Sequence, residues 1–353
     1  MKSSLFLDIE TNRNRELAFF NKSEQEIFRK IFLHQDRIAQ LEKIAYLSRN
    51  KWSRIEAILS LGYCESPSLS DVFKKSLWDK DEDICYFSMI ALAQTKTIDS
   101  AKILLDFLKQ RPLYHHKIVS LLGQFPQGIS AETARLLKDQ DPSMRFLGLR
   151  ILVGLKPQHL VKEVEALTSD TSGDVRSAAC ECLGDMRDRR SVVALLKCLE
   201  DDLWLVRASA VKALEQILGA RSIPMIVHLI KDNSWLVIAS AKKAIAKHIE
   251  DALPYIEKIF HEKDELAKKI CVEIIETSGH AVHLCRNLLS ENPGQKRRAV
   301  SIIDGILKSS PGYGLQVALN DLKSNERRAV LQIMQGINQE CSKAMNQTNP
   351  VIK

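Results

Sequence analysis

Apolar residues recur at intervals of three, four and seven positions along most of the chain, which is the spacing of one face of an α-helix. The segments 52–62, 173–184 and 205–214 share one frame. An anchor residue, most often Arg, is followed by a small residue three positions later and by Leu seven positions later, and Gly often comes next. Each of these segments predicts an amphipathic helix that buries its apolar face.

The same frame recurs along the chain at intervals of 29 to 31 residues. Its ten anchors are Arg54, Cys85, His115, Arg145, Arg176, Arg207, Ile238, Lys268, Arg297 and Arg328. A second apolar segment follows each of the first nine anchors, at 68–77, 99–108, 130–137, 159–167, 190–199, 221–230, 251–260, 280–289 and 312–322. Each unit is therefore predicted to be a helical hairpin, and strand patterns are absent. The expected fold is all-α, an α-solenoid of about ten stacked helical hairpins.

Glycine and proline punctuate this pattern. Gly62, Gly123 and Gly184 lie 61 residues apart, where we expect each helix to end in a residue with positive φ. Prolines are expected near helix starts, where the missing N–H costs little. They are Pro67, Pro142, Pro157, Pro224 and Pro254.

An acidic residue recurs six positions before the anchor. The series comprises Asp79, Asp139, Asp170, Asp201, Asp232 and Glu262. These carboxylates suit either of two roles: accepting backbone N–H groups at a helix start, or pairing with the anchor Arg of an adjacent unit. We interpret the acids, together with Arg54, Arg145, Arg176 and Arg207, as a structural ladder, because their period follows the fold.

Residues 183–214 resemble the HEAT repeat in its short bacterial form, the phycobilin-lyase type. The resemblance covers roughly residues 50–340 and is best over 140–250. It implies a HEAT-like superhelix whose surfaces bind partners. Residues 1–49 are expected to hold a capping helix, roughly Glu24 to Leu47, ahead of a repeat array over 50–340. A polar, frayed tail is expected over 341–353.

Charge and cysteine content say more about the cell compartment of the protein than about its function. The 51 Lys and Arg against 44 Asp and Glu give +7, a mildly basic chain that does not demand nucleic acid. Eight Cys without a CxxC pair indicate buried thiols in a reducing compartment. No apolar run is long enough for a secretion signal or a membrane span, so a cytoplasmic protein is expected.

Several short motifs suggest chemistry but lack the partners it needs. Residues 4–12, with Asp8 and Glu10, resemble the first motif of exonucleases with paired metal-binding carboxylates, yet the later motifs and strands of that fold are missing. His280, His283 and Cys285 have a zinc-compatible spacing without a further ligand pair. The His261-Glu262 pair resembles those of HEAT-like di-iron hydroxylases, which use several such pairs. We therefore predict no enzyme activity, no cofactor and no metal.

The second helices of a stacked array line its concave face, where a partner is expected to bind. The position two before the last apolar residue of each second helix is predicted to face outward. These candidate positions are Lys75, Asp106, Arg135, Glu165, Lys197, His228, Lys258, Asn287 and Asn320. A nucleic-acid groove needs a continuous basic stripe, whereas this row mixes both signs and favours a protein or peptide.

Trp204 and Trp235 lie 31 residues apart, each three positions before its anchor. They suit either an exposed pair that contacts a partner or side chains that fill the seam between repeats, and the seam is the commoner arrangement.

The sequence thus predicts a non-catalytic scaffold or adaptor that binds a protein along its concave face. Two alternatives remain. One is a nucleic-acid-binding protein like the HEAT-like DNA glycosylases, favoured by the +7 charge and the two tryptophans. The other is a chromophore-handling protein like the phycobilin lyases, which only the repeat type suggests.

Overall fold

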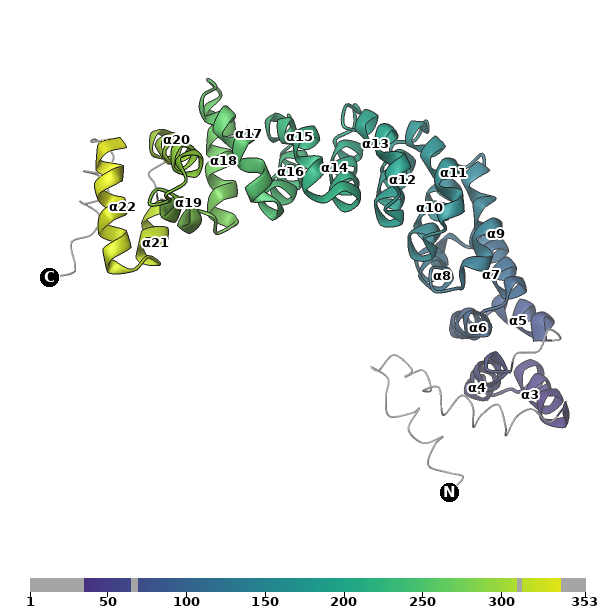
Figure 1. Cartoon of the computed structure of the whole chain (residues 1–353). Helices are drawn as coiled ribbons and strands as arrows, with labels where there is room; N and C mark the ends of the chain where they lie inside the picture. The colour runs from purple at the N-terminus through teal and green to yellow at the C-terminus, as the bar shows by residue number, and fades with distance from the viewer. Residues whose placement is uncertain (1–34, 65–68, 310–312, 338–353) are drawn as a thin grey trace. The chain divides into compact units, whose positions relative to one another are not determined.

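The computed structural model describes residues 35–64, 69–309 and 313–337, and these residues form helices and no strands (Figure 1). The chain divides into two compact units, Met1–Thr133 and Ala134–Lys353, with the boundary inside helix α9. Each of the ten predicted anchors lies in a helix of its own, and each predicted second segment is also helical. The prediction of an all-α fold built from repeated helical hairpins is confirmed.

The first unit contains one additional helix followed by helical hairpins. Its helices are α3 (Gln35–Leu47), α4 (Lys51–Gly62), α5 (Ser70–Leu77), α6 (Glu82–Thr95), α7 (Ile98–Gln110), α8 (His115–Leu122) and α9 (Ser130–Ala134). Helix α3 packs against α4 and α5, and α4 packs against α6. The part of the expected capping helix before Gln35, Pro67, and the expected tail all lie outside the described residues.

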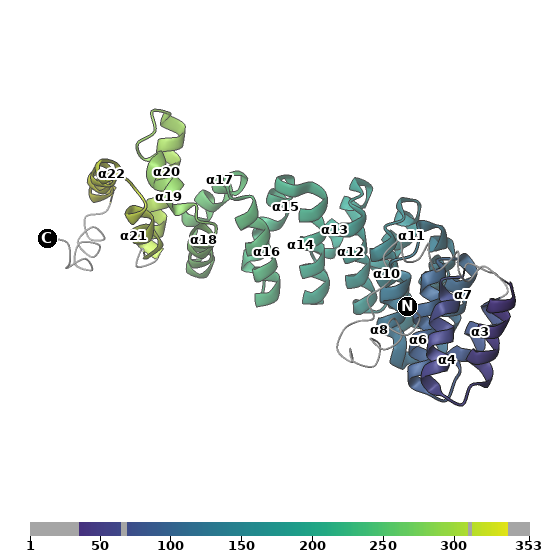
Figure 2. The same cartoon turned by 90° about the horizontal axis from the view of Figure 1, so that it is seen from below.

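The second unit stacks further hairpins side by side (Figure 2). Its first helices are α10 (Pro142–Leu155), α12 (Gly173–Met186), α14 (Trp204–Leu218), α16 (Trp235–Lys247), α18 (Glu265–Thr277), α20 (Pro293–Ser309) and α22 (Ser324–Ile337). Its second helices are α11 (Val161–Ala166), α13 (Val192–Cys198), α15 (Ile223–Ile226), α17 (Ile249–Phe260), α19 (Ala281–Asn287) and α21 (Tyr313–Asn320). Helices α10, α12, α14, α16, α18 and α20 pack in that order.

Several second helices are shorter than the apolar pattern predicts, because 3-10 turns take over at their ends. Helix α11 is flanked by turns at Gln158–Leu160 and Leu167–Ser169, and α15 by turns at Gly219–Ser222 and Val227–Lys231. A 3-10 turn tightens the last hydrogen bonds before the chain enters the next loop. Conversely, α17 begins earlier than expected, so that Pro254 lies inside the helix instead of at its start.

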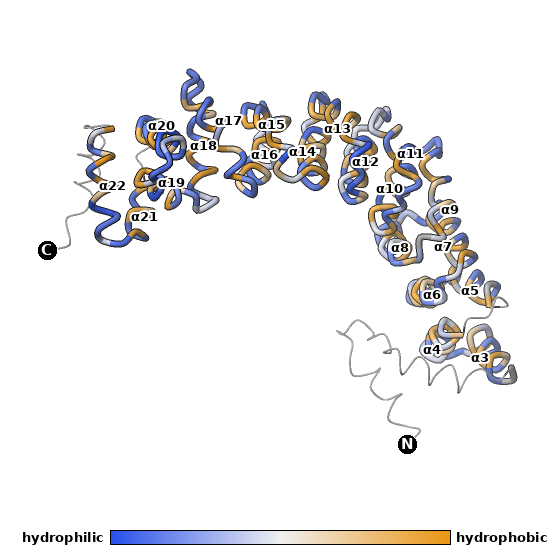
Figure 3. Tube along the Cα trace, viewed as in Figure 1, coloured by the Kyte–Doolittle hydropathy of each residue, from blue (hydrophilic) through white to orange (hydrophobic). Residues whose placement is uncertain are grey.

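The core consists of small and aliphatic side chains between neighbouring helices. Ala179, Ala210 and Ala241, each three positions after its anchor, are fully buried, and so are Leu183 and Leu214. In Figure 3 the apolar residues recur at intervals along each helix instead of forming one block. Each hairpin therefore buries its apolar face on its neighbours, as the helical period predicts.

The glycines do not play the role that their spacing suggested. Gly62 and Gly184 lie within the last turns of α4 and α12, and Gly123 has φ −62°, so the expectation of positive φ is wrong at all three. A Cβ on Gly184 would lie 2.9 Å from Ala213 Cα, and one on Gly62 would lie 2.8 Å from Ala91 Cα. These two glycines let adjacent first helices approach closely.

Left-handed residues end other helices instead. Lys96, Lys156 and Arg187 have φ of 53°, 50° and 54°, and they follow the last residues of α6, α10 and α12. A left-handed residue at this position lets the chain leave the helix. Here lysine and arginine take the conformation that glycine adopts more easily.

Candidate functional site

The Arg and Asp residues of the repeat form bidentate ion pairs between neighbouring hairpins. Arg176 on α12 donates from Nε and Nη2 to the two carboxylate oxygens of Asp201, at 2.7 and 2.9 Å. The pairs Arg145–Asp170 and Arg207–Asp232 have the same geometry, with distances of 2.7 to 2.8 Å. In the first unit, Arg54 donates to Asp79. Each Arg thus contacts the Asp that lies 25 residues later in the chain.

Several ladder residues also hold a loop in place. Arg176 Nη1 donates to the backbone oxygen of Asp170, and Asp201 Oδ1 accepts the backbone N–H of Leu203. Asp139 accepts the N–H of Asp141 in the same way. The two roles considered for these carboxylates, accepting backbone N–H groups and pairing with Arg, therefore coexist in a single residue.

The ladder also sets the charge state of its carboxylates. Burial acts to raise the pKa of Asp201, but the hydrogen bonds from Arg176 and from the Leu203 N–H outweigh it, so this pKa lies below its usual value. The pKa values of Asp170 and Asp232 are lowered in the same way, because hydrogen bonds from an Arg and from a backbone N–H outweigh the effect of burial. The pairs stay ionised at neutral pH and link one hairpin to the next.

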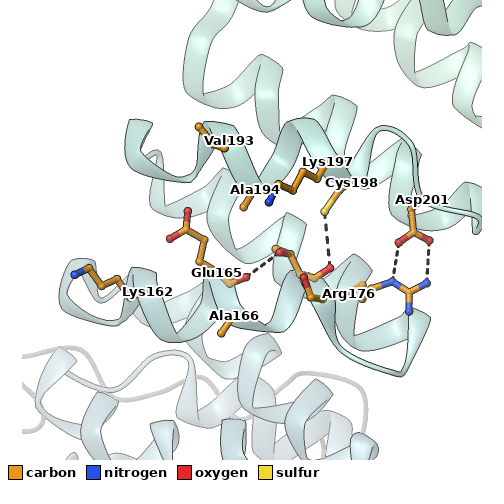
Figure 4. Close-up of a pocket in the computed structure, with 11 residues that line it drawn as sticks. Lys162, Glu165, Ala166, Arg176, Val193, Ala194, Lys197, Cys198 and Asp201 are labelled. Carbon is orange, nitrogen blue, oxygen red and sulfur yellow. Dashed lines mark hydrogen bonds and ion pairs between the residues drawn. The ribbon is translucent and has the colours of Figure 1, made fainter.

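A groove lies beside the ladder, between the second helices α11 and α13 (Figure 4). Its volume is about 580 Å³. Lys162 and Glu165 come from α11, Val193 and Lys197 come from α13, and the Arg176–Asp201 pair lies at one end. The groove is thus built from two successive hairpins that the ladder holds together.

The groove combines an apolar surface with charges of both signs. Val193 is 66% exposed, although it is an aliphatic residue on a helix. In Figure 4 the carboxylate of Glu165 and the ammonium of Lys197 point into the space between α11 and α13. Lys162 adds a second exposed ammonium group. The groove thus presents one exposed aliphatic side chain together with charges of both signs.

The groove also contains a buried thiol. Cys198 is 4% exposed, and its Sγ lies 4.0 Å from the backbone oxygen of Thr168. A hydrogen bond from Cys180 lowers the pKa of Cys198. A catalytic thiol is usually paired with a base that takes its proton, most often an imidazole. The residues that line this groove include no histidine.

The nine candidate positions on the second helices all face outward to some extent. Glu165 and Asn287 are half-buried, and the others are exposed, namely Lys75, Asp106, Arg135, Lys197, His228, Lys258 and Asn320. Lys75 and Asp106 belong to the first unit. Only Glu165 and Lys197 among the nine line the groove.

Sequence reasoning missed Lys162 and Val193, two further groove residues on these helices. Lys162 precedes Glu165 by three positions, and Val193 precedes Lys197 by four. Both spacings place a residue on the same helical face as its row position. The helical period could therefore have identified both.

The tryptophans lie at the surface. Trp204 is 42% exposed and Trp235 is 72% exposed, so the expectation that they fill the seam between repeats is wrong. Each is the first residue of its helix, α14 or α16, where the side chain projects past the packed part of the hairpin. Leu266, near the start of α18, is similarly exposed and was not singled out from the sequence.

The remaining candidate motifs make other contacts. His280 is buried and its ring stacks on that of His283, with centroids 5.3 Å apart. His261 Nε2 lies 3.2 Å from Ser301 Oγ, whereas Glu262 pairs with Lys231. Within the described ranges, no group of three His, Cys, Asp or Glu side chains is arranged to hold a metal ion. Asp8 and Glu10 lie outside those ranges.

One described segment, Trp204–Lys231, is long and apolar enough to cross a membrane by length and composition alone. In the structure this segment is a hairpin. Helix α14 ends at Leu218, Gly219 takes φ 57°, and the chain continues through α15. The apolar residues Val211, Leu214, Ile223 and Ile226 are buried in the stack.

Comparison with known proteins identifies the repeat. The family of HEAT repeats matches residues 130–215 and 194–276. No curated protein matches the chain. Solved structures that resemble it include an engineered protein, with 16% identity over 88% of this chain and 97% of that chain and a TM-score of 0.38.

Two natural assemblies are also among the similar structures. The CpcE–CpcF complex of phycocyanin lyase from Nostoc matches with 14% identity over 76% of this chain and 94% of that chain, with a TM-score of 0.33. The structure that describes Kap95p binding to RanGDP matches with 11% identity over 89% and 52%, with a TM-score of 0.42. Residues 130–276 of the present chain, which include the groove and the pairs Arg145–Asp170, Arg176–Asp201 and Arg207–Asp232, match the family of HEAT repeats.

Proposed function

We propose that this chain is a non-catalytic cytoplasmic scaffold that binds a protein partner through the exposed face of its second helices. The observation that carries the proposal is the α11–α13 groove, where exposed Val193 lies between Glu165 and Lys197. Helix α3 closes the N-terminal end of the repeat array, and the Arg–Asp ladder is structural.

The rigidity of the groove supports binding. Its two walls belong to successive hairpins, and the bidentate Arg176–Asp201 pair fixes one hairpin against the other. A surface that is already ordered loses little conformational entropy when it binds. A protein partner would therefore meet a preformed surface.

The charges favour a protein over nucleic acid. Within the second unit, the row begins Arg135, Glu165 and Lys197, so a carboxylate stands between two cations. A phosphate backbone would be repelled at Glu165, since affinity for nucleic acid depends on one cation for each phosphate contact. A polypeptide can place charges of both signs along such a row.

Affinity capture with matched charge reversals tests the proposal. Lys197→Glu changes an exposed residue of the groove, whereas Lys212→Glu makes the same change at an exposed position on the first helix α14. The full-length chain and the Lys212→Glu variant should capture the same protein, and Lys197→Glu combined with Val193→Glu should lose it. Equal capture by all three proteins would refute binding at the groove.

Nucleic acid remains the second candidate, because the chain carries +7 and its four tryptophans are exposed. Binding of a labelled duplex at increasing salt separates the two functions. A nucleic-acid-binding array should bind at low salt and lose affinity steeply as salt rises. The scaffold proposal predicts weak binding that Lys197→Glu reduces no more than Lys212→Glu does.

A further inference from the structure

Three successive hairpins present a large apolar side chain at the start of their first helices. Trp204 begins α14, Trp235 begins α16, and Leu266 is the second residue of α18. Their side chains are 42%, 72% and 64% exposed. These three residues, 31 positions apart in sequence, are here termed the apolar edge.

The helices that carry the apolar edge are neighbours in the stack. Helix α14 packs against α16, and α16 packs against α18 (Figures 1 and 2). Packed helices lie about 8–10 Å apart, so the edge spans roughly 20 Å. A fully extended peptide of about six residues covers that length.

The fold does not require large residues at this register. The equivalent position of the preceding hairpin is Gly173, the first residue of α12. A Cβ at Gly173 would collide with the Leu203 side chain, so there the neighbouring loop covers the helix start. Three adjacent exposed apolar residues are therefore not explained by packing, and contiguous exposed apolar surface commonly marks an interaction site.

The loops that lead into these helices are acidic, although the whole chain is basic. Residues 200–204, 231–235 and 261–266 carry seven carboxylates and two lysines. Arg176, Arg207 and Lys268 neutralise Asp201, Asp232 and Glu265, which leaves a formal excess of two negative charges. Glu200 and Asp202, next to Trp204, are exposed. The edge is thus complementary to a basic partner.

We propose that the apolar edge binds an extended segment of another protein that carries Arg or Lys at about every third residue. The faces of Trp204 and Trp235 accept the cations, and the neighbouring carboxylates neutralise them. Arginine suits the site better than lysine, because its planar guanidinium stacks on an indole ring. This surface lies at the starts of first helices, whereas the α11–α13 groove lies between second helices and reaches the loop 200–204 at Asp201, so the edge would add a second binding site to the scaffold.

A designed peptide tests this proposal. The probe alternates Arg with pairs of Ser, and a matched peptide replaces each Arg with Glu. Binding to the full chain is followed by tryptophan fluorescence and by calorimetry. The Arg peptide should bind and the Glu peptide should not. Binding of both peptides, or of neither at low salt, would overturn the proposal.

Tryptophan substitutions test whether the Arg peptide binds at the apolar edge. Trp235→Ala should weaken the Arg peptide about fivefold, as expected for the loss of one cation–π contact, and Trp235→Phe should restore part of the affinity. Trp52→Ala removes another exposed indole, from α4 in the first unit, and should leave the affinity for the Arg peptide unchanged. Equal affinity of wild type and Trp235→Ala would place the peptide elsewhere.

Two further measurements test the role of the carboxylates and the possibility that a second copy of the chain covers the edge. Glu200→Gln with Asp202→Asn should weaken the Arg peptide and reduce the dependence of its affinity on salt. Unchanged affinity in that variant would contradict the proposed role of the carboxylates. Sedimentation of the wild type without peptide tests the alternative occupant. Self-association that Trp235→Ala abolishes would show that a second copy of the chain covers the edge and would overturn the proposal.

Discussion

At the scale of single residues, the Arg–Asp pairs determine how one hairpin is fixed to the next. Arg176 makes two hydrogen bonds to Asp201 and one to the backbone oxygen of Asp170. It therefore joins a carboxylate of the following hairpin to the loop of its own. A point charge cannot replace this geometry, because lysine lacks the planar fork of guanidinium donors.

We predict that Arg176→Ala lowers the free energy of unfolding by about 1–2 kcal/mol, since a partly buried charged hydrogen-bonding group loses its partner. Arg176→Lys should recover little of that loss. Urea denaturation measures both effects. The more exposed pair Arg150–Glu181 is the control, and Arg150→Ala should leave the urea midpoint nearly unchanged. Equal loss in the two Ala variants would contradict the role of the ladder.

His280 is a buried histidine whose pKa is lowered by burial and by the neighbouring His283, against an opposing effect of Glu250. Its Nε2 has no hydrogen-bond partner among the described residues. Because the folded pKa lies below the unfolded value of 6.5, the unfolded chain binds the proton more readily. This group's contribution to stability is present above pH 6.5 and is lost as the pH falls through that value.

We therefore predict that His280→Leu reduces the fall in thermal stability between neutral and mildly acidic pH. One group contributes at most about 1.4 kcal/mol per pH unit to that fall. Thermal unfolding followed by circular dichroism across this range measures it. His228→Leu changes an exposed histidine and should leave the pH dependence in place. A pH dependence that is identical in wild type and His280→Leu would refute the prediction.

At the scale of helices, two glycines differ in how closely a neighbouring helix packs against them. Gly184 faces Ala213 of α14, where a Cβ would meet backbone that cannot move aside. Gly336 on α22 has open space around it, so a methyl group there meets nothing. The same substitution should therefore have opposite effects at the two sites.

We predict that Gly184→Ala destabilises the chain by about 1–3 kcal/mol through overpacking. Gly336→Ala should stabilise it by up to about 1 kcal/mol, because alanine has the higher helix propensity. Chemical denaturation of both variants provides the comparison. Stabilisation by Gly184→Ala would show that α12 and α14 are not in close contact.

The helical period predicted the hairpins, because apolar residues that recur with this period lie on one face of a helix, and that face is the one that is buried. All ten anchors lie in separate helices, and the second segments from 68–77 to 312–322 are helical. The period carries no information on φ at a glycine, and for this reason Gly62, Gly123 and Gly184 were misinterpreted. It also does not show how far a side chain projects at a helix start, so Trp204 and Trp235 were expected in the seam.

Part of the groove could be predicted from the sequence. The row supplied Glu165 and Lys197, and the same helical faces include Lys162 and Val193. The sequence did not indicate which two second helices would leave a groove between them. That property depends on where the helices end and how their side chains pack; a 3-10 turn ends α11 and another precedes α13.

At the scale of the whole molecule, the match to the HEAT-repeat family covers three of the four Arg–Asp pairs. Residues 130–276 match HEAT repeats, and this range contains Arg145–Asp170, Arg176–Asp201 and Arg207–Asp232. The pair Arg54–Asp79 lies outside this range, and two anchors inside it, Ile238 and Lys268, are not Arg. Hairpins with and without the pairs share one fold, so burial of apolar faces builds the stack and each pair adds a link between two successive hairpins.

This division of roles predicts that the two binding surfaces act independently. The groove lies between second helices, whereas the apolar edge lies at the starts of first helices. Trp235→Ala should therefore leave affinity for the groove partner within about twofold of wild type, since distant sites are usually additive. Titration of that partner against the variant measures the effect. Equal loss at both surfaces would indicate a single site.

The central claim is that a protein partner occupies the α11–α13 groove. Site-specific photo-crosslinking tests it directly, with a benzophenone side chain at position 193 in the groove or at position 212 on α14. We predict one discrete adduct from position 193, lost when Lys197→Glu is added, and no such adduct from position 212. The same adducts from both positions, or none from position 193, would contradict the account.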